Sequence, residues 1–303
     1  ARWNLILDAD ERLVSGQAQL RALCAQPAEW IGVLPVASTF DLAGPQGSSR
    51  VETSTAWLPR LLPGSVRYQG AVHEQPVSAL PRRRLAIGIA HTGYRRAALE
   101  RMRGRNRRLL QAMLAARPDT ATATGAEAQA ETDADPASQP ATAYLRYQLG
   151  KDHEVYGEFA AAADQYQRAR PGVPAEAAYR HDLIVRLLFC LKCTGELETA
   201  ILLAEQERAR WSQSPDFFFV LGDLLLDWAL AHPQDAEQTI LPMVEAAWMT
   251  CLEIGEQPGL EGTVQGRGSF LAAHNLAVLH AQFGRTEQAA RYQRLAREWR
   301  GEG

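Results

Sequence analysis

The 303-residue chain has few lysines, few cysteines and no long apolar run. Only Lys151 and Lys192 are lysines, so arginine supplies almost all of the positive charge, a bias typical of GC-rich genomes. The net charge of −3 gives no global indication of binding to nucleic acid or to an anionic membrane. No segment approaches the roughly 20 apolar residues of a membrane span, and no signal peptide pattern opens the chain. We therefore expect a cytoplasmic protein without a nucleic-acid partner or a membrane span.

Four cysteines, Cys24, Cys190, Cys193 and Cys251, are too few and too irregularly spaced for a disulfide scaffold. Cys190 and Cys193 have the Cys-x-x-Cys spacing of redox and zinc motifs. However, they lie in an apolar helical run and no second cysteine pair accompanies them, so packing is favoured over chemistry. The sequence also lacks a Gly-rich nucleophile elbow and a Gly-rich phosphate loop.

The first 117 residues combine strand and helix patterns. The apolar run Trp3–Leu7 ends at Asp8-Ala9-Asp10-Glu11, which is typical of a buried parallel strand with polar residues at its carboxyl edge. Ser15 is expected to cap a helix that ends near Cys24, and a second strand is expected over 30–36. Short β-prone runs broken by Pro and Gly over 51–90 predict an antiparallel or mixed sheet edge, and 95–117 predicts an amphipathic helix. Residues 1–117 are therefore an α/β domain with a mixed sheet.

Residues 118–141 contain no aromatic side chain and no aliphatic side chain larger than alanine. Such a segment buries too little apolar area to offset the entropy of ordering, so we expect a flexible linker.

Residues 142–303 are expected to be all-α, with a period of about 34 residues, the length of a tetratricopeptide helix pair. The first repeat places Leu149-Gly150, Gly157, Ala162, Tyr166, Ala169 and Pro174 at the spacings of that motif. Small residues at Gly150 and Ala162 allow the two helices to approach, and Tyr166 fills the groove between them. The last repeat has Leu276-Ala277, Gly284, Ala289 and Ala296 at the same offsets. Weaker matches lie at Leu187-Leu188, Gly195 and Ala200, and at Leu221-Gly222, where the following turn is too long for the motif.

Asp8 and Asp10 are candidate metal ligands. Alternate residues of an extended strand end share a face, so both carboxylates can hold one hard divalent cation whose other ligands are diphosphate oxygens. An Asp-x-Asp spacing is common by chance, and a pair of solvated acids at a loop is the alternative.

His73 and Glu74 follow the β-prone run 66–72 and form a second candidate pair. Glu74 is a candidate general base, and His73 a candidate metal or phosphate ligand. Arg60, His91 and the run Arg82–Arg84 are candidates for neutralising phosphate. Each of these residues has an ordinary surface role as its alternative.

Taken in order, five segments resemble the family 2 glycosyltransferases of the GT-A type that carry carboxyl-terminal tetratricopeptide repeats. The segments are Trp3–Glu11, Trp57–Leu61, Tyr68–Glu74, His91–Tyr94 and Arg105-Asn106. The resemblance implies a nucleotide-sugar donor, a manganese or magnesium ion held through Asp8 and Asp10, and an acceptor site near Val72-His73-Glu74. It also implies transfer of a hexose to a protein, peptide or glycan acceptor, with Glu74 as the base and Arg60 and His91 on the donor side.

Members of that family begin with a strand and an acidic loop that hold the nucleobase, and we find no such segment ahead of Ala1. The expectation is therefore either a fragment of a longer enzyme or a chain that has lost donor binding. The alternative function, from a different class, is a non-catalytic tetratricopeptide scaffold that holds a protein partner on its repeat surface.

Overall fold

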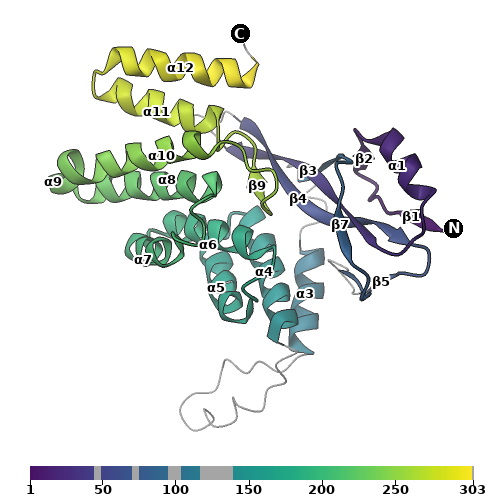
Figure 1. Ribbon diagram of the computed structural model, residues 1–303. Coiled ribbons are helices and arrows are strands. Elements are labelled where there is room, and N and C mark those ends of the chain that lie inside the picture. The colour runs from purple at the N-terminus through teal and green to yellow at the C-terminus, as the bar shows by residue number, and fades with distance from the viewer. Residues whose placement is uncertain (44–48, 70–74, 95–103, 117–138, 302–303) are drawn as a thin grey trace, which may run out of the picture. The chain divides into compact units, whose positions relative to one another are not determined.

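The computed structural model describes residues 1–43, 49–69, 75–94, 104–116 and 139–301 (Figure 1). The chain divides into two compact units, Ala1–Leu109 and Leu110–Gly303. Within the described residues, no helix is long and apolar enough to cross a membrane.

The first unit contains a mixed, curled sheet. Its strands are β1 (Trp3–Leu5), β2 (Glu11–Leu13), β3 (Ile31–Ala43), β4 (Ser49–Pro63), β7 (Arg82–Arg84) and β8 (Ile89–Tyr94). The strand order is β1-β4-β3-β8-β2, and β7 also pairs with β3. The pairs β1/β4, β3/β4 and β2/β8 are antiparallel, whereas β3 pairs with β7 and β8 in parallel. Short strands β5 (Tyr68–Gln69) and β6 (Gln75–Pro76) form a separate antiparallel pair.

An apolar cluster on this sheet is built around two tryptophans. The rings of Trp3 and Trp30 lie 4.6 Å apart between centroids, and they pack with Leu34, Leu61 and Ile87. Helix α1 (Gln17–Cys24) adds apolar side chains to the same cluster. Burial of these side chains stabilises a sheet whose outer strands are only three residues long.

Three expectations for the first unit are corrected. Strand β1 runs antiparallel to β4, so it does not end at the carboxyl edge of a parallel sheet. Ser15 does not cap α1: Gly16 precedes the helix with φ +81°, and the Ser15 hydroxyl accepts the Gly88 N–H at 3.0 Å. The region expected to hold short broken strands begins with one long strand, β4. Pro59 is tolerated in β4 because it lies at the register shift between Gly32 and Val33, where regular pairing is interrupted.

Helix α3 (Arg105–Ala115) confirms the expected amphipathic helix over its described part. The expected linker, 118–141, lies outside the described residues as far as residue 138, and α4 begins at Gln139.

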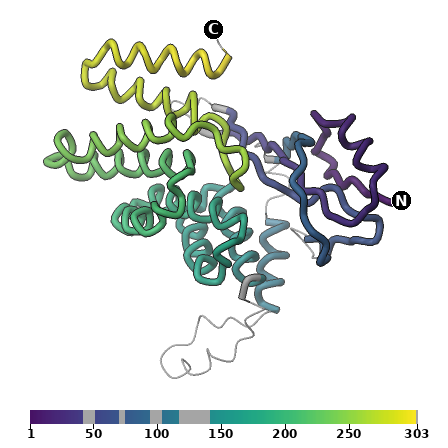
Figure 2. The backbone as a smooth tube through the Cα atoms, viewed as in Figure 1, coloured from purple at the N-terminus to yellow at the C-terminus, as the bar shows by residue number. Residues whose placement is uncertain are grey.

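Residues 139–301 form helical hairpins that pack against one another in chain order (Figures 1 and 2). The hairpins are α4 (Gln139–Val155) with α5 (Phe159–Ala169), α6 (Arg180–Thr194) with α7 (Leu197–Glu207), α8 (Pro215–Ala231) with α10 (Leu241–Ile254), and α11 (Phe270–Gln282) with α12 (Thr286–Arg300). A short 3₁₀ turn, Arg170–Gly172, follows α5. The third hairpin contains α9 (Pro233–Asp235) and a π-helical turn, Ala236–Ile240, which explains its long connection. The expected helical repeat array is thereby confirmed.

Glycine sets the distance between the helices of two hairpins. A Cβ added at Gly150 would lie 2.5 Å from the ring of Tyr166, and one added at Gly222 would lie 2.4 Å from the Trp248 indole. Both distances are below van der Waals contact, so the aromatic ring occupies the space that a side chain would need. The Tyr166 side chain is fully buried, as the repeat spacing predicted.

We expect Gly150→Leu to destabilise the helical unit by about 1–3 kcal/mol, because the new side chain overpacks the contact with Tyr166. Urea unfolding followed by far-UV circular dichroism measures the change. The matched control is Ala160→Leu at an exposed position of α5, which should alter stability by less than about 0.5 kcal/mol. Equal effects of the two substitutions would contradict the close contact.

Candidate functional site

The structure describes four of the site residues that the sequence predicts. Asp8, Asp10, Arg60 and His91 are described, whereas His73 and Glu74 lie outside the described residues. The proposed metal and base roles of His73 and Glu74 therefore stay predictions.

Asp8 and Asp10 lie in a turn between β1 and β2, in which the Glu11 N–H donates to the Asp8 carbonyl at 3.0 Å. The alternation of faces expected from an extended strand does not apply in a turn. The Arg60 guanidinium donates to Asp8 Oδ2 at 2.7 Å and also to the Glu11 carboxylate. Burial opposes the charge of Arg60, but Glu11 and Asp8 outweigh it and raise the Arg60 pKa. Arg60 therefore holds the turn through two carboxylates.

His91 and Asp10 form a separate contact. His91 Nε2 lies 3.4 Å from Asp10 Oδ2, and Nδ1 lies 3.0 Å from the Ser38 hydroxyl. Asp8 and Asp10 thus have different basic partners. In the part of the chain that the structure describes, no group of three or more His, Cys, Asp or Glu side chains is arranged to hold a metal ion.

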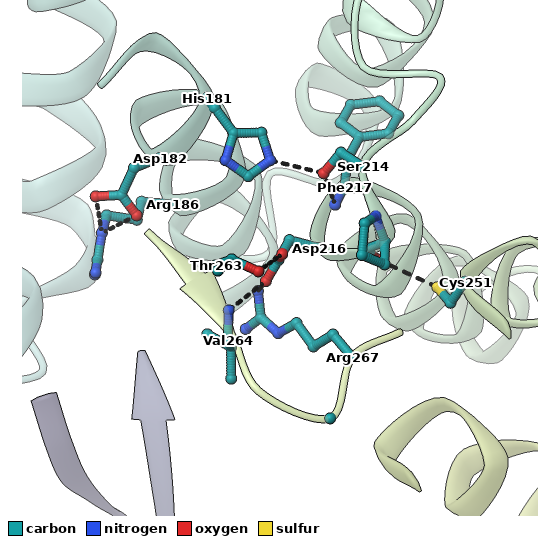
Figure 3. A network of polar contacts seen from close by, with 12 residues as sticks. His181, Asp182, Arg186, Ser214, Asp216, Phe217, Cys251, Thr263, Val264 and Arg267 are labelled. Carbon is teal, nitrogen blue, oxygen red and sulfur yellow. Dashed lines mark hydrogen bonds and ion pairs between the residues drawn. The ribbon is translucent and has the colours of Figure 1, made fainter. Parts of the chain in front are cut away.

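The helical unit holds a second polar cluster, centred on Arg186 of α6. Figure 3 shows its contact with Asp182. Its Nε donates to both oxygens of Asp182, at 2.9 and 2.8 Å, and its Nη1 donates to Glu154 of α4 at 2.7 Å. The hydroxyl of Tyr147 donates to Asp182, and that of Tyr166 donates to Glu154 at 2.7 Å. Burial, together with the neighbouring carboxylates, raises the pKa of both tyrosines, so both hydroxyls remain donors.

Asp182 is ionised in this cluster. Burial alone would raise its pKa, but Arg186, Lys151 and the hydrogen bonds of Tyr147 and Arg186 outweigh burial and lower it to about 2. A buried carboxylate with these donors is stable only while its partners are in place.

Polar contacts link the first helices of successive hairpins. Besides Arg186–Glu154 between α4 and α6, Lys192 Nζ lies 3.3 Å from Asp227 Oδ2 between α6 and α8. The Asn275 amide donates to Asp223 Oδ1 at 3.3 Å between α8 and α11. These helices share a surface that we call the first-helix face. It comprises Lys151, Arg186, Lys192, Cys193, Asp223, Asp227 and Asn275.

At the beginnings of α6 and α8, the first helices also meet the α10–α11 loop, residues 255–269. His181 Nε2 lies 2.6 Å from the Ser214 hydroxyl, and its Nδ1 lies 2.7 Å from the Glu261 carbonyl. Ser214 in turn accepts the Phe217 N–H at 3.0 Å and so caps α8. Asp216, which is fully buried, accepts from the Thr263 hydroxyl at 2.7 Å and from the Val264 N–H at 2.9 Å. Figure 3 shows Asp216 between α8 and the loop.

Sequence reasoning missed these acidic residues, although a signal was present. Asp182 and Asp216 are 34 residues apart, and each lies six positions before the small or apolar motif residue, Leu188 or Gly222. They therefore hold equivalent places in successive repeats. The repeat motif is defined by its packing residues, so it does not mark polar residues that recur with the same period.

The structure separates the two cysteines of the Cys-x-x-Cys motif. Cys190 is fully buried in α6, and burial raises its pKa, whereas Cys193 is exposed. The Cys190 environment is that of a packing residue, because burial disfavours the thiolate that redox chemistry or zinc binding needs.

We expect Asp182→Asn to destabilise the helical unit by about 3 kcal/mol at pH 7, because Arg186 loses one of its two carboxylates. The stabilisation by Asp182 is present above the unfolded-state pKa of 3.8 and is lost as the pH falls toward about 2. The stability gap between wild type and variant should therefore narrow below pH 4. Urea unfolding at a series of pH values measures the gap. Asp164→Asn, in an exposed pair with Arg168, is the control and should change stability by less than about 0.5 kcal/mol.

Asp223 should behave in the opposite way. Loss of hydration between the helices raises its pKa to about 6, and Asp227 adds to the shift, while Lys192 and Arg267 counteract it. Above pH 6, Asp223 ionises in the folded protein at a free-energy cost that is absent in the unfolded chain. Its ionisation therefore lowers the free energy of unfolding. We expect Asp223→Asn to stabilise the protein by about 1–2 kcal/mol at pH 7 and to have little effect at pH 4. The control Asp227→Asn should be neutral or destabilising at both pH values, since it loses the contact with Lys192. A loss of stability on Asp223→Asn at pH 7 would contradict the assignment.

No family model matches the chain, and no curated protein matches it. The solved structures that are similar in part include two of MamA. The crystal structure of MamA shares 14% identity over 68% of this chain and 95% of that chain, with a TM-score of 0.44. MamA 41-end from Desulfovibrio magneticus RS-1 shares 14% identity over 68% of this chain and 93% of that chain, with a TM-score of 0.42.

The expected membership of the family 2 glycosyltransferases is wrong. No family model matches the chain, and the similar solved structures reported above are of MamA. The sheet supplies a physical reason, because β1 is antiparallel and its acidic residues lie in a turn paired with Arg60 and His91. The nucleotide-sugar donor, the sugar acceptor and the transfer reaction rested on that resemblance alone. The helical hairpins of residues 139–301 do not depend on it.

Proposed function

We propose that residues 139–301 form a non-catalytic scaffold that binds protein partners on the first-helix face. The observation that carries this proposal is the set of interhelical contacts, in which polar side chains of α4, α6, α8 and α11 join consecutive first helices into one surface. Stacked helical hairpins expose an extended surface of this kind, and such surfaces suit peptide and protein ligands.

The charges of the first-helix face support a protein ligand of mixed charge. The basic residues Lys151, Arg186 and Lys192 lie on α4 and α6, and the acidic residues Asp223 and Asp227 lie on the neighbouring helix α8. Their side chains are partly exposed, at 25% for Lys151, 21% for Lys192 and 38% for Asp227. A surface with a basic part next to an acidic part favours a partner whose charges are complementary to both parts, and it disfavours uniformly charged ligands such as nucleic acid.

Cys193 offers a direct test, because it is exposed and lies close enough to Glu154 and Asp227 for their charges to affect its thiol. A thiol-linked photocrosslinker is attached to Cys193 in the full chain carrying Cys24→Ser. The matched control carries Cys193→Ser and Leu202→Cys, which moves the probe to α7, where Leu202 is 59% exposed. In extract of cells that express the protein, we expect discrete adducts from position 193 and not from position 202.

Charge reversal provides the second arm of the experiment. Asp227→Lys should reduce the adduct yield at Cys193 several-fold, whereas Glu205→Lys, exposed on α7, should leave it unchanged. Equal adduct yields at positions 193 and 202, or a yield at Cys193 that is unchanged by Asp227→Lys, would contradict binding at the first-helix face.

A further inference from the structure

An open hollow of about 350 Å³ lies between the turn that joins α6 to α7 and the end of α8. Along α6 and α8, its lining begins within about one helical turn of Lys192 and Asp227, whose side chains form an ion pair at 3.3 Å. The hollow therefore adjoins the first-helix face. The residues that line it are Gly195–Thr199, Trp228, Ala231 and His232.

The hollow is acidic. Glu196 and Glu198 are exposed at the start of α7, and among the described residues no lysine or arginine lines the hollow. The Thr194 hydroxyl lies 3.1 Å from Glu196 Oε1 and helps to position that carboxylate. Helix α8 ends here, and the C-terminal end of a helix carries a partial negative charge. The start of α7 adds a partial positive charge, but two full carboxylate charges exceed it, so the hollow favours a cation.

Trp228 and His232 form an aromatic wall of the hollow. Their rings stack, with centroids 3.8 Å apart and an interplanar angle of 29°. His232 Nδ1 lies 3.0 Å from the Trp228 carbonyl, and a carbonyl only accepts, so Nδ1 carries a proton and donates. In the neutral imidazole Nε2 is therefore an acceptor. The wall thus offers an indole, the aromatic group that binds cations best, and one ring acceptor.

The spacing of the acceptors favours a planar organic cation over a metal ion. Within the described ranges, no three acidic or histidine side chains are arranged to hold a metal ion, so Glu196, Glu198 and His232 are too far apart to ligate one together. A guanidinium presents five N–H donors in one plane, pairs with carboxylates and stacks on indole rings. A lysine ammonium is a compact and strongly hydrated charge, which suits this wall less well.

We propose that the hollow binds an arginine side chain of the protein partner that occupies the first-helix face. Glu196 and Glu198 pair with the guanidinium, and Trp228 stacks on it. A partner segment that lies over the ion pair of Lys192 and Asp227 brings such an arginine within reach of the hollow. The inference rests on the proposed scaffold function and specifies one side chain of the partner and its binding site.

The first test measures the binding of acetyl-arginine amide to the full chain with nitrogen-15-labelled tryptophan. The indole N–H signal of Trp228 is assigned by its loss in Trp228→Phe. We expect the arginine compound to shift this signal in a saturable way. The citrulline compound, which has nearly the same shape and no charge, should leave the signal in place because it cannot pair with the carboxylates.

Charge removal supplies the variant for this measurement. Glu196→Gln/Glu198→Gln keeps the size of both exposed side chains and should weaken arginine binding at least about fivefold. The matched control Glu205→Gln, at an exposed position of α7 outside the hollow, should leave the affinity unchanged.

The second test asks whether a protein partner supplies the arginine, and it uses the photocrosslinker at Cys193. Glu196→Gln/Glu198→Gln should reduce the adduct yield at Cys193 several-fold, whereas Glu205→Gln should not. Excess acetyl-arginine amide should also reduce the yield, because it competes with the arginine of the partner. Neither the citrulline compound nor sodium chloride at the same ionic strength should have the same effect.

Two results would overturn the inference. One is a Trp228 signal that the arginine compound does not shift, or that the citrulline compound shifts equally. The other is an adduct yield at Cys193 that is unchanged in Glu196→Gln/Glu198→Gln. If adducts still form at position 193 and not at position 202, either result removes the arginine site and leaves the scaffold function standing. Loss of position-dependent crosslinking, with arginine binding intact, would instead remove the first-helix face as the docking surface and assign the hollow to a small guanidinium compound.

Discussion

The helical unit depends on the charge of Arg186 being shared between two carboxylates from different hairpins. Moving a guanidinium out of water costs several kcal/mol, and only well-placed carboxylates and hydrogen bonds compensate for that cost. Asp182 and Glu154 provide the negative charges. The hydroxyls of Tyr147 and Tyr166 donate to the oxygens of these two carboxylates. Because these groups come from α4, α5 and α6, the cluster fixes how the first hairpin packs on the second.

The apolar contacts and this ionic cluster reinforce each other. Tyr166 occupies the space that Gly150 leaves open, and the position of its ring directs its hydroxyl to Glu154. A side chain at Gly150 would therefore disturb both the helix contact and the partner of Arg186. The same cluster holds Asp182, whose carboxylate lies directly against Gly262 of the α10–α11 loop.

Local periodicity predicted the helical unit well. The small residues, the aromatic at Tyr166 and the turn glycines recur at fixed offsets because each repeat solves the same packing problem. The first unit was predicted less well, since an apolar run such as Trp3–Leu7 has the same pattern in a parallel and an antiparallel strand. Its direction is set by pairing with β4, more than fifty residues later in the chain.

The candidate site shows the same limit. Asp8 and Asp10 attracted attention because acidic pairs after strands often bind metals, yet the partners of each, Arg60 and His91, come from distant strands. Asp182 and Asp216 recur at the repeat period, but their partners, like the contacts of Arg186, follow from helices that only the fold brings together. Ordered similarity of short segments over 3–117 likewise could not establish a family, because each segment is compatible with several pairings.

The sharing of Arg186 is tested most directly by a double-mutant cycle with Glu154→Gln and Asp182→Asn. Urea unfolding, read by hydrogen exchange of peptides from α4 and α6, gives the free energy of each variant in the helical unit itself. If both carboxylates bind one guanidinium, the loss of unfolding free energy in the double variant should exceed the sum of the two single losses by at least about 1 kcal/mol. The second substitution then leaves a buried cation without a counter-charge. Additive effects within about 0.5 kcal/mol would contradict the account.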